Sequence, residues 1–131
     1  MRIGLDVMGG DFAPVAAIDG AILAAKELSG NDKIVLIGQE TAIRSLLHER
    51  GCDASIFDIV HAPEVIEMGE HPTKAMTRKP DSSISVGFQL LKHKKLDSFA
   101  SAGNSGAMLV GSIFSVNTIP GIVRPLTSAI I

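Results

Sequence analysis

The sequence predicts an α/β protein with a three-layer α/β/α, Rossmann-like architecture and a mostly parallel sheet. Short apolar runs, typical of buried strands, alternate with longer segments in which apolar residues recur every three or four positions. Glycine-rich turns follow the first and fourth runs, as they do where a strand leads into a helix. With 131 residues, 46% of them hydrophobic, the chain is long enough for one domain, residues 1–131.

Five strands are expected, at residues 2–7, 33–38, 55–61, 98–102 and 127–131. The second run, Ile-Val-Leu-Ile, is continuous and β-branched, as in a strand buried on both faces of a parallel sheet. The fifth run stands at the last residues of the sequence. We therefore expect a sheet truncated after strand five and a chain that is a fragment of a longer protein.

Four helices are expected, at residues 14–28, 41–50, 83–95 and 107–117, and a further helix between the third strand and residue 83 is left open. The first would bury a stripe made of Val15, Ile18, Ile22, Ala25 and Leu28. Gly30 would end the first helix as a C′ glycine, and Gly51 would stop the second. Asp81-Ser82-Ser83 has the composition of an N-cap, and residues 65–79 are expected to be the least regular part.

Composition limits the class of protein. The formal charge of −2 gives no field that favours nucleic acid. A single cysteine suits a reducing compartment, and the sequence has neither a run of about 18 apolar residues nor a signal peptide, so a cytoplasmic location is expected. Asp6 and Asp11 could bind a metal, but no third ligand has supporting spacing, so no metal is expected.

Two glycine-rich loops are the first candidates for a site. Residues 101–107 read Ser-Ala-Gly-Asn-Ser-Gly-Ala, and residues 8–11 read Met-Gly-Gly-Asp. Such loops bring backbone N–H groups and a helix N-terminus to an anion. Gly103 and Gly106 allow a positive φ and close backbone approach, while Asn104 and Ser105 supply side-chain donors. The alternative is a pair of ordinary strand-to-helix turns.

A second candidate lies further along the chain. Arg78 and Lys79 precede the helix N-terminus at Ser82-Ser83, and together they offer a guanidinium fork, an ammonium and two hydroxyls to an anion. The alternative is a solvated basic turn. Cys52 is expected at the opposite edge of the sheet from these loops, and we interpret it as structural. His61 and His71 are nearer and could move a proton or serve as polar filling.

These motifs resemble a known family, the acyl-carrier-protein:phosphate acyltransferases (the PlsX family). Asp6-Val-Met-Gly-Gly-Asp11 is similar to that family's opening motif. Arg78-Lys-Pro-Asp-Ser-Ser-Ile84 resembles its Arg-x-Lys-x-x-Ser-Ser-Ile motif without one spacer, and Ser101-Ala-Gly-Asn-Ser-Gly-Ala107 matches its glycine loop with Ser105 in place of threonine. Arg124-Pro125 also fits. The family's chains are much longer, so the resemblance covers their N-terminal part.

The resemblance implies transfer of a fatty acyl group from acyl carrier protein to inorganic phosphate, which gives acyl phosphate for bacterial phospholipid synthesis. It also implies a homodimer at the membrane surface, no organic cofactor, and a membrane glycerol-phosphate acyltransferase as the next enzyme. Lys92–Lys95 could meet the acidic carrier protein or could be a solvated helix end. Two other classes stay open: a phosphotransacetylase-like or dehydrogenase-like enzyme, and a non-catalytic phosphate-binding fragment.

The reaction suggests a role for each candidate. Phosphate would bind Lys79, Ser82 and Ser83, helped by Arg78. The tetrahedral oxyanion would be stabilised by N–H groups around residues 103–106 with Asn104 and Ser105. Asp11 would orient the loop or the nucleophile, and Gly9-Gly10 and the glycines at 103 and 106 would let the backbone approach closely.

Overall fold

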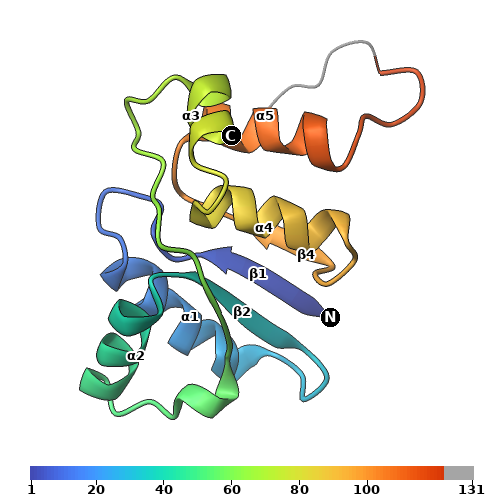
Figure 1. The fold of residues 1–131 in the computed structure, drawn as a ribbon. Helices are drawn as coiled ribbons and strands as arrows, with labels where there is room; N and C mark the ends of the chain where they lie inside the picture. Colours follow the sequence, from blue (N-terminus) through green and yellow to red (C-terminus); the bar gives the residue numbers. More distant parts are fainter. Residues whose placement is uncertain (123–131) are drawn as a thin grey trace, which may run out of the picture.

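The computed structural model describes residues 1–122 and shows a four-stranded parallel sheet of order β3-β2-β1-β4 (Figure 1). The strands are β1 (Arg2–Asp6), β2 (Lys33–Gly38), β3 (Asp58–His61) and β4 (Ser98–Ala100). Leu5 of β1 lies opposite Leu36 of β2 and Ala100 of β4. The predicted parallel α/β sheet is therefore confirmed for four strands; the fifth, expected at 127–131, lies outside the described residues, as does Arg124-Pro125.

Helices cover both faces of the sheet, and the predicted three layers are present (Figure 1). On one face, α1 (Val15–Glu27) and α2 (Glu40–Glu49) bury Ile18, Ile43 and Leu47 against β2. On the other face, α4 (Ser83–Lys92) packs on β1, β2 and β4. The remaining helices, α3 (Pro72–Arg78) and α5 (Ser105–Ser115), pack against each other, and α5 also packs on α4.

Two glycines set how closely α4 packs against its neighbours. A Cβ on Gly87 would lie 2.2 Å from Cζ of Phe99 in β4, and a Cβ on Gly111 of α5 would lie 2.2 Å from Cδ2 of Phe88. Phe88 and Phe99 also meet edge to face with ring centroids 5.2 Å apart, an arrangement that stabilises aromatic pairs. Because these two residues lack side chains, the Phe88–Phe99 pair can pack between β4, α4 and α5.

Residues 65–79, expected to be the least regular part, contain the helix that was left open, α3, which begins with Pro72 in its first turn, a position that Pro favours. Several other local predictions were wrong. The third strand begins at Asp58 instead of residue 55, because Asp53 caps a short 3₁₀ helix, η1 (Ala54–Ile56). Gly30 does not cap α1, which ends at Glu27 with Leu28 as C-cap, whereas Gly51 follows α2 with φ +62° as expected. Val15 is exposed, and Ala21 is buried beside Ile18 instead.

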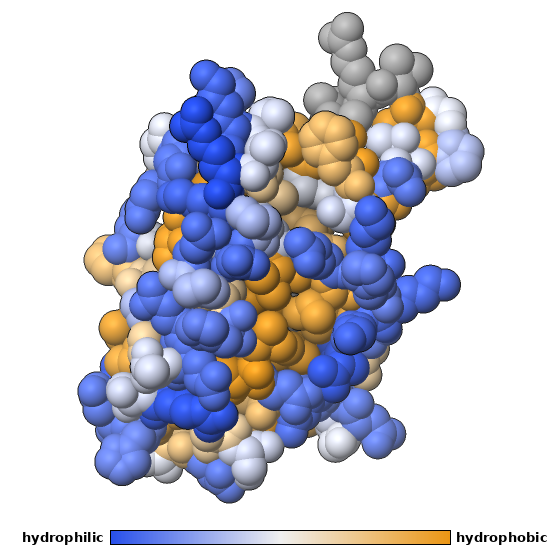
Figure 2. Space-filling model, viewed as in Figure 1, coloured by the Kyte–Doolittle hydropathy of each residue, from blue (hydrophilic) through white to orange (hydrophobic). Residues whose placement is uncertain are grey.

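Apolar surface gathers in the middle of the viewed face, at the level of the strands and between the helical layers, with hydrophilic residues around it (Figure 2). A separate apolar cavity of about 540 Å³ lies along α1 and is lined by residues such as Leu5, Ala17, Gly20 and Ala100. Within residues 1–122, no helix combines the length and the apolar character needed to cross a membrane.

Candidate functional site

Both glycine loops lie at the carboxyl ends of neighbouring strands, and a buried carboxylate joins them. Asp6, the last residue of β1, is 1% exposed. Its Oδ1 accepts from the Met8 N–H at 2.9 Å, and its Oδ2 accepts from the Ser101 hydroxyl at 2.6 Å. The same Ser101 oxygen accepts from the Gly103 N–H at 3.0 Å. One carboxylate therefore fixes the start of both loops, because β1 and β4 are adjacent in the sheet.

The loops also touch through their backbones. A Cβ on Gly9 would lie 2.6 Å from the Gly103 nitrogen and 2.6 Å from Oδ2 of Asp6, so only glycine allows this approach. The predicted close approach is thus present at Gly9 and Gly103. The predicted positive φ is not: Gly103 and Gly106 lie outside the left-handed region, and Gly10 has φ +105° instead.

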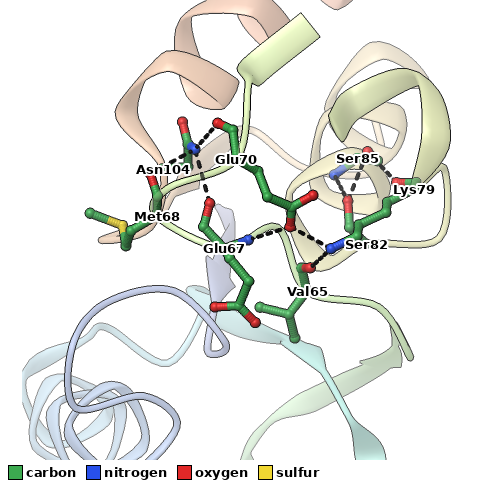
Figure 3. Close-up of polar contacts among 8 residues, drawn as sticks. All are labelled: Val65, Glu67, Met68, Glu70, Lys79, Ser82, Ser85 and Asn104. Carbon is green, nitrogen blue, oxygen red and sulfur yellow. Dashed lines mark hydrogen bonds and ion pairs between the residues drawn. The ribbon is translucent and has the colours of Figure 1, made fainter. Parts of the chain in front are cut away.

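Asn104 joins the second loop to a turn at residues 67–70 (Figure 3). It is the N-cap of α5, and its Oδ1 accepts from the Ala107 N–H at 2.9 Å. Its Nδ2 donates to the main-chain carbonyls of Glu67 and Glu70, both at 3.0 Å, and lies 3.3 Å from that of Met68. The side chain predicted to donate to an oxyanion therefore holds the 67–70 turn in this structure.

The 67–70 turn in turn meets Lys79, the C-cap of α3. The Lys79 ammonium donates to the Val65 carbonyl at 2.7 Å and to Oε1 of Glu70, which also accepts from the Glu67 N–H at 2.8 Å (Figure 3). The hydrogen bond from Lys79, followed by the one from the Glu67 N–H, lowers the pKa of the Glu70 carboxyl below its usual range. This pair is about 30% exposed, at 29% for Lys79 and 31% for Glu70, so both groups remain within reach of a small solute.

The two serines beside Lys79 are buried at the start of α4. Ser82 is its N-cap and accepts from the Ser85 N–H at 3.3 Å, and its hydroxyl donates to the Ser85 hydroxyl at 2.9 Å. The Ser85 hydroxyl in turn donates to the Lys79 carbonyl at 2.9 Å. Ser83 is 1% exposed, and its N–H donates to the Glu64 carbonyl at 3.2 Å. The N-cap predicted from Asp81-Ser82-Ser83 is therefore confirmed, with Ser82 as the capping residue.

The other predicted site residues lie at the surface. Arg78, Asp11 and Ser105 are exposed, and their side chains make no hydrogen bond to any residue of the described part of the chain. Gly106 packs on Pro72, since a Cβ there would lie 2.4 Å from the Pro72 Cγ. Through this contact and Asn104, the structure brings the second glycine loop close to residues 78–83, which we call the cation–serine segment. Their roles toward a substrate stay predictions.

Sequence reasoning missed Glu70, Ser101 and the structural use of Asp6. Glu70 precedes Lys79 by nine residues, and no motif pairs carboxylates and ammonium groups at that distance. The role of Asp6 could have been predicted, because a carboxylate at the end of a buried strand needs hydrogen-bond donors nearby. Among residues 1–122 no cluster of three His, Cys, Asp or Glu side chains could hold a metal ion.

The remaining candidates have ordinary contacts. The thiol of Cys52 is half-buried behind α2, 3.9 Å from the Asp53 carbonyl. Nδ1 of His61 accepts from the Glu40 N–H at 3.2 Å, and His71 is the N-cap of α3 without a side-chain bond. The apolar cavity reaches Gly9, Gly10 and Asp11 at one end, so an apolar group would lie against the first glycine loop there.

Comparison with known proteins assigns the chain to a family. A family model described as "Fatty acid synthesis protein" matches residues 1–130. This chain belongs to that family. Over all of its 131 residues it is 46% identical to the phosphate acyltransferase of Dictyoglomus turgidum and 48% identical to that of Acetivibrio thermocellus, covering 38% of each. The chain therefore spans less than two fifths of the length of these relatives.

A solved structure with the same fold is the EutD phosphotransacetylase from Staphylococcus aureus. The TM-score is 0.61 at 18% sequence identity, and the match covers 95% of this chain and 40% of that one. At this identity the likeness concerns the fold. It agrees with the three-layer α/β arrangement predicted from the sequence.

Proposed function

We propose that this chain forms the phosphate-binding part of an acyltransferase that moves a fatty acyl group from acyl carrier protein to inorganic phosphate. The observation that carries the proposal is the continuous contact from the two glycine loops through Asn104 and the 67–70 turn to Lys79. Donors suited to an oxyanion and a cation suited to phosphate are thereby neighbours at one edge of the sheet. The similarity to proteins named phosphate acyltransferase supports the reaction class.

In the proposed reaction a phosphate oxygen attacks the thioester carbonyl, a C–O bond forms, and the C–S bond breaks. The thiolate of the carrier protein leaves and takes up a proton, and acyl phosphate remains. Inorganic phosphate is substantially ionised near pH 7, by analogy with phosphoesters whose second pKa is about 6, so a strong base is dispensable. The protein's main contributions are to hold phosphate against the carbonyl and to stabilise the oxyanion.

The residues divide between these two tasks. Lys79, Ser82 and Ser83 would hold phosphate together with Arg78, whose exposed side chain is free to move toward it. The N–H groups of Ser105 and Gly106 open α5 and have no acceptor within residues 1–122, so they would serve the oxyanion. In this arrangement Asn104 positions the loop, and Asp11 orients the loop or the nucleophile.

The proposal also includes its partners. The enzyme would be a cytoplasmic homodimer that associates peripherally with the membrane and passes acyl phosphate to a membrane glycerol-phosphate acyltransferase. The exposed Lys92–Lys95 stretch would meet the acidic carrier protein. Sedimentation with anionic lipid vesicles and with carrier protein would test these interactions separately.

The test of the reaction uses a chimera in which residues 1–131 replace the matching segment of the Dictyoglomus turgidum protein. Acyl phosphate made from acyl carrier protein thioester and phosphate is trapped with hydroxylamine, and coenzyme A thioester is assayed in parallel. We expect product from the carrier thioester and a raised KM for phosphate in Lys79→Ala. Lys74→Ala, which removes an exposed lysine of the same helix α3, is the matched control and should leave KM unchanged.

A folded chimera that makes no acyl phosphate, while the relative does, would reject the acyltransferase. Product from coenzyme A thioester alone would favour the phosphotransacetylase-like alternative. Phosphate binding without turnover in the chimera would favour a non-catalytic binding function.

A further inference from the structure

Glu70 occupies the one partly buried cation of the proposed phosphate site. Of the three hydrogens that the Lys79 ammonium can donate, one goes to the Val65 carbonyl and one to Oε1 of Glu70. Arg78, its neighbour, has no such partner within residues 1–122. An incoming anion at Lys79 therefore meets a carboxylate already in place.

The donors around Glu70 are of the kind that bind an anion. Its Oε1 accepts from an ammonium and from the backbone N–H of Glu67, a charged donor combined with a main-chain donor (Figure 3). The N-terminus of α4 comes three residues after Lys79, with Ser82 as N-cap and Ser83 as its first residue. A carboxylate oxygen in this setting has the place and the partners of an anionic ligand.

The carboxylate can also leave. The Glu70 and Lys79 side chains are about one third exposed, and the turn that carries Glu70 is held through its main-chain carbonyls by Asn104. Breaking the Glu70–Lys79 contact therefore does not require the turn to come apart. The side chain can swing to solvent while the backbone stays in place.

We propose that Glu70 is an internal anion that holds the Lys79 ammonium until inorganic phosphate displaces it from there, which leaves the Glu67 N–H without its acceptor. This rests on the proposed function in one respect, that Lys79 binds phosphate. The carboxylate then lowers phosphate affinity by competition, and it keeps Lys79 oriented when phosphate is absent. Releasing phosphate or its acyl derivative would be aided by the return of Glu70.

The first experiment measures binding of inorganic phosphate to this chain by calorimetry at fixed pH and ionic strength. Glu70→Gln keeps the size of the side chain and an oxygen for the Glu67 N–H but removes the charge. We expect it to bind phosphate about threefold to fivefold more tightly, the range expected for the loss of a partly exposed ion pair. Glu27→Gln, at an exposed carboxylate at the end of α1, is the control for loss of a negative charge and should stay within about twofold of the parent, in the range typical of surface changes.

A second measurement needs no variant. Amide hydrogen exchange of the Glu67 N–H is compared with and without saturating phosphate, with the Ala107 N–H, which bonds to Asn104, as internal reference. Displacement of Glu70 predicts faster exchange at Glu67 and no change at Ala107.

The outcomes separate the two proposals. Equal phosphate affinity of Glu70→Gln and the parent, or weaker affinity of the variant, would overturn the competition, and so would unchanged exchange at Glu67. If the folded parent and Glu70→Gln both fail to bind phosphate, the phosphate site itself is wrong and the inference falls with it. Tighter binding by Glu70→Gln with faster Glu67 exchange on phosphate addition would establish Glu70 as the displaceable anion.

Discussion

The glycine loops and the cation–serine segment differ in how their polar groups are used. In the loops, the buried Asp6 carboxylate accepts hydrogen bonds from the Ser101 hydroxyl and the Met8 N–H. The N–H groups of Gly9 and Gly10 have no acceptor within the described residues. In the cation–serine segment two groups that would bind phosphate are already bonded to other side chains: Lys79 donates to Glu70, and Ser82 donates to Ser85.

This difference shows two ways of preparing a site for an anion. The loops are held in place by the buried Asp6 carboxylate, so their outer N–H groups stay free. A ligand could bind these donors without displacing a protein group. In the cation–serine segment Lys79 is paired with a carboxylate, which avoids a partly buried lysine without a partner, and under our proposal phosphate would have to compete with that carboxylate. Substitutions in the loops should therefore lower the stability of the fold most. Substitutions at Glu70 should instead change the affinity for phosphate and the pH dependence of stability.

The largest effect is expected from Asp6→Ala. The change removes a 1% exposed carboxylate and leaves the Met8 N–H and the Ser101 hydroxyl without their acceptor. Loss of a charge-assisted bond together with an unsatisfied buried donor costs about 3 kcal/mol. Equilibrium unfolding in urea measures it, and Asp11→Ala, at the exposed carboxylate of the same loop, should change the free energy of unfolding by less than about 0.5 kcal/mol. Similar losses in both variants would mean that the loops are not held in place by the buried Asp6 carboxylate.

Gly9→Ala should come next. The new Cβ would lie 2.6 Å from the Gly103 nitrogen, so the loops must separate, and overpacking of this kind costs about 2 kcal/mol. Gly69→Ala is the matched control, because a Cβ there meets nothing within 4 Å and φ is not positive. Thermal unfolding of the two variants compares them. A Gly9→Ala protein as stable as Gly69→Ala would show that the contact between the loops is dispensable.

Asn104→Asp tests the link between the two regions with a smaller effect. The aspartate can still cap α5 through the Ala107 N–H, but it cannot donate to the carbonyls of the 67–70 turn. We expect a loss of about 1 kcal/mol and faster hydrogen exchange in that turn, with exchange at Ala107 unchanged. Asn104→Ala, which removes the cap as well, should accelerate hydrogen exchange both in the turn and at Ala107. Equal exchange in the turn for Asn104→Asp and the parent would contradict the link.

The fold was largely predictable because its signals are local. Continuous β-branched runs and three-to-four-residue spacing mark buried strands and helices, and residues 33–38 were predicted with the bounds that the structure shows. The helix α3 was left open, without bounds, because its seven residues offer one buried apolar side chain, Ala75, and no periodicity. Gly30 misled because a glycine after a helix caps it only where the chain turns left-handed, as at Gly51.

The site was less predictable because its contacts join distant residues. Glycine, serine and cation motifs located the loops and Lys79, since these residue types have few other uses at strand ends. The bonds from Asn104 to the 67–70 turn depend on how α3 packs against α5. Asn104 and Glu70, for example, are 34 residues apart in the sequence. The partner of Lys79 could not be predicted either, because the sequence holds several nearby carboxylates and does not show which of them lies beside the ammonium.

The smallest expected effect concerns pH and tests whether the Glu70–Lys79 contact is a charged pair. Because the pKa of Glu70 is lowered in the folded protein, its ionised form stabilises the fold at pH values above the ordinary 4.5. That contribution is lost as the pH falls through the lowered pKa. The parent should therefore be more stable than Glu70→Gln at neutral pH, and the difference should disappear in acid, as measured by urea unfolding at a series of pH values. In a Lys79→Ala background the pH-dependent difference should shrink, because the largest cause of the lowered pKa has been removed. A difference that is the same with and without Lys79 would mean that the Glu67 N–H alone holds the carboxylate, and the cation–serine segment would then be as open to phosphate as the glycine loops are.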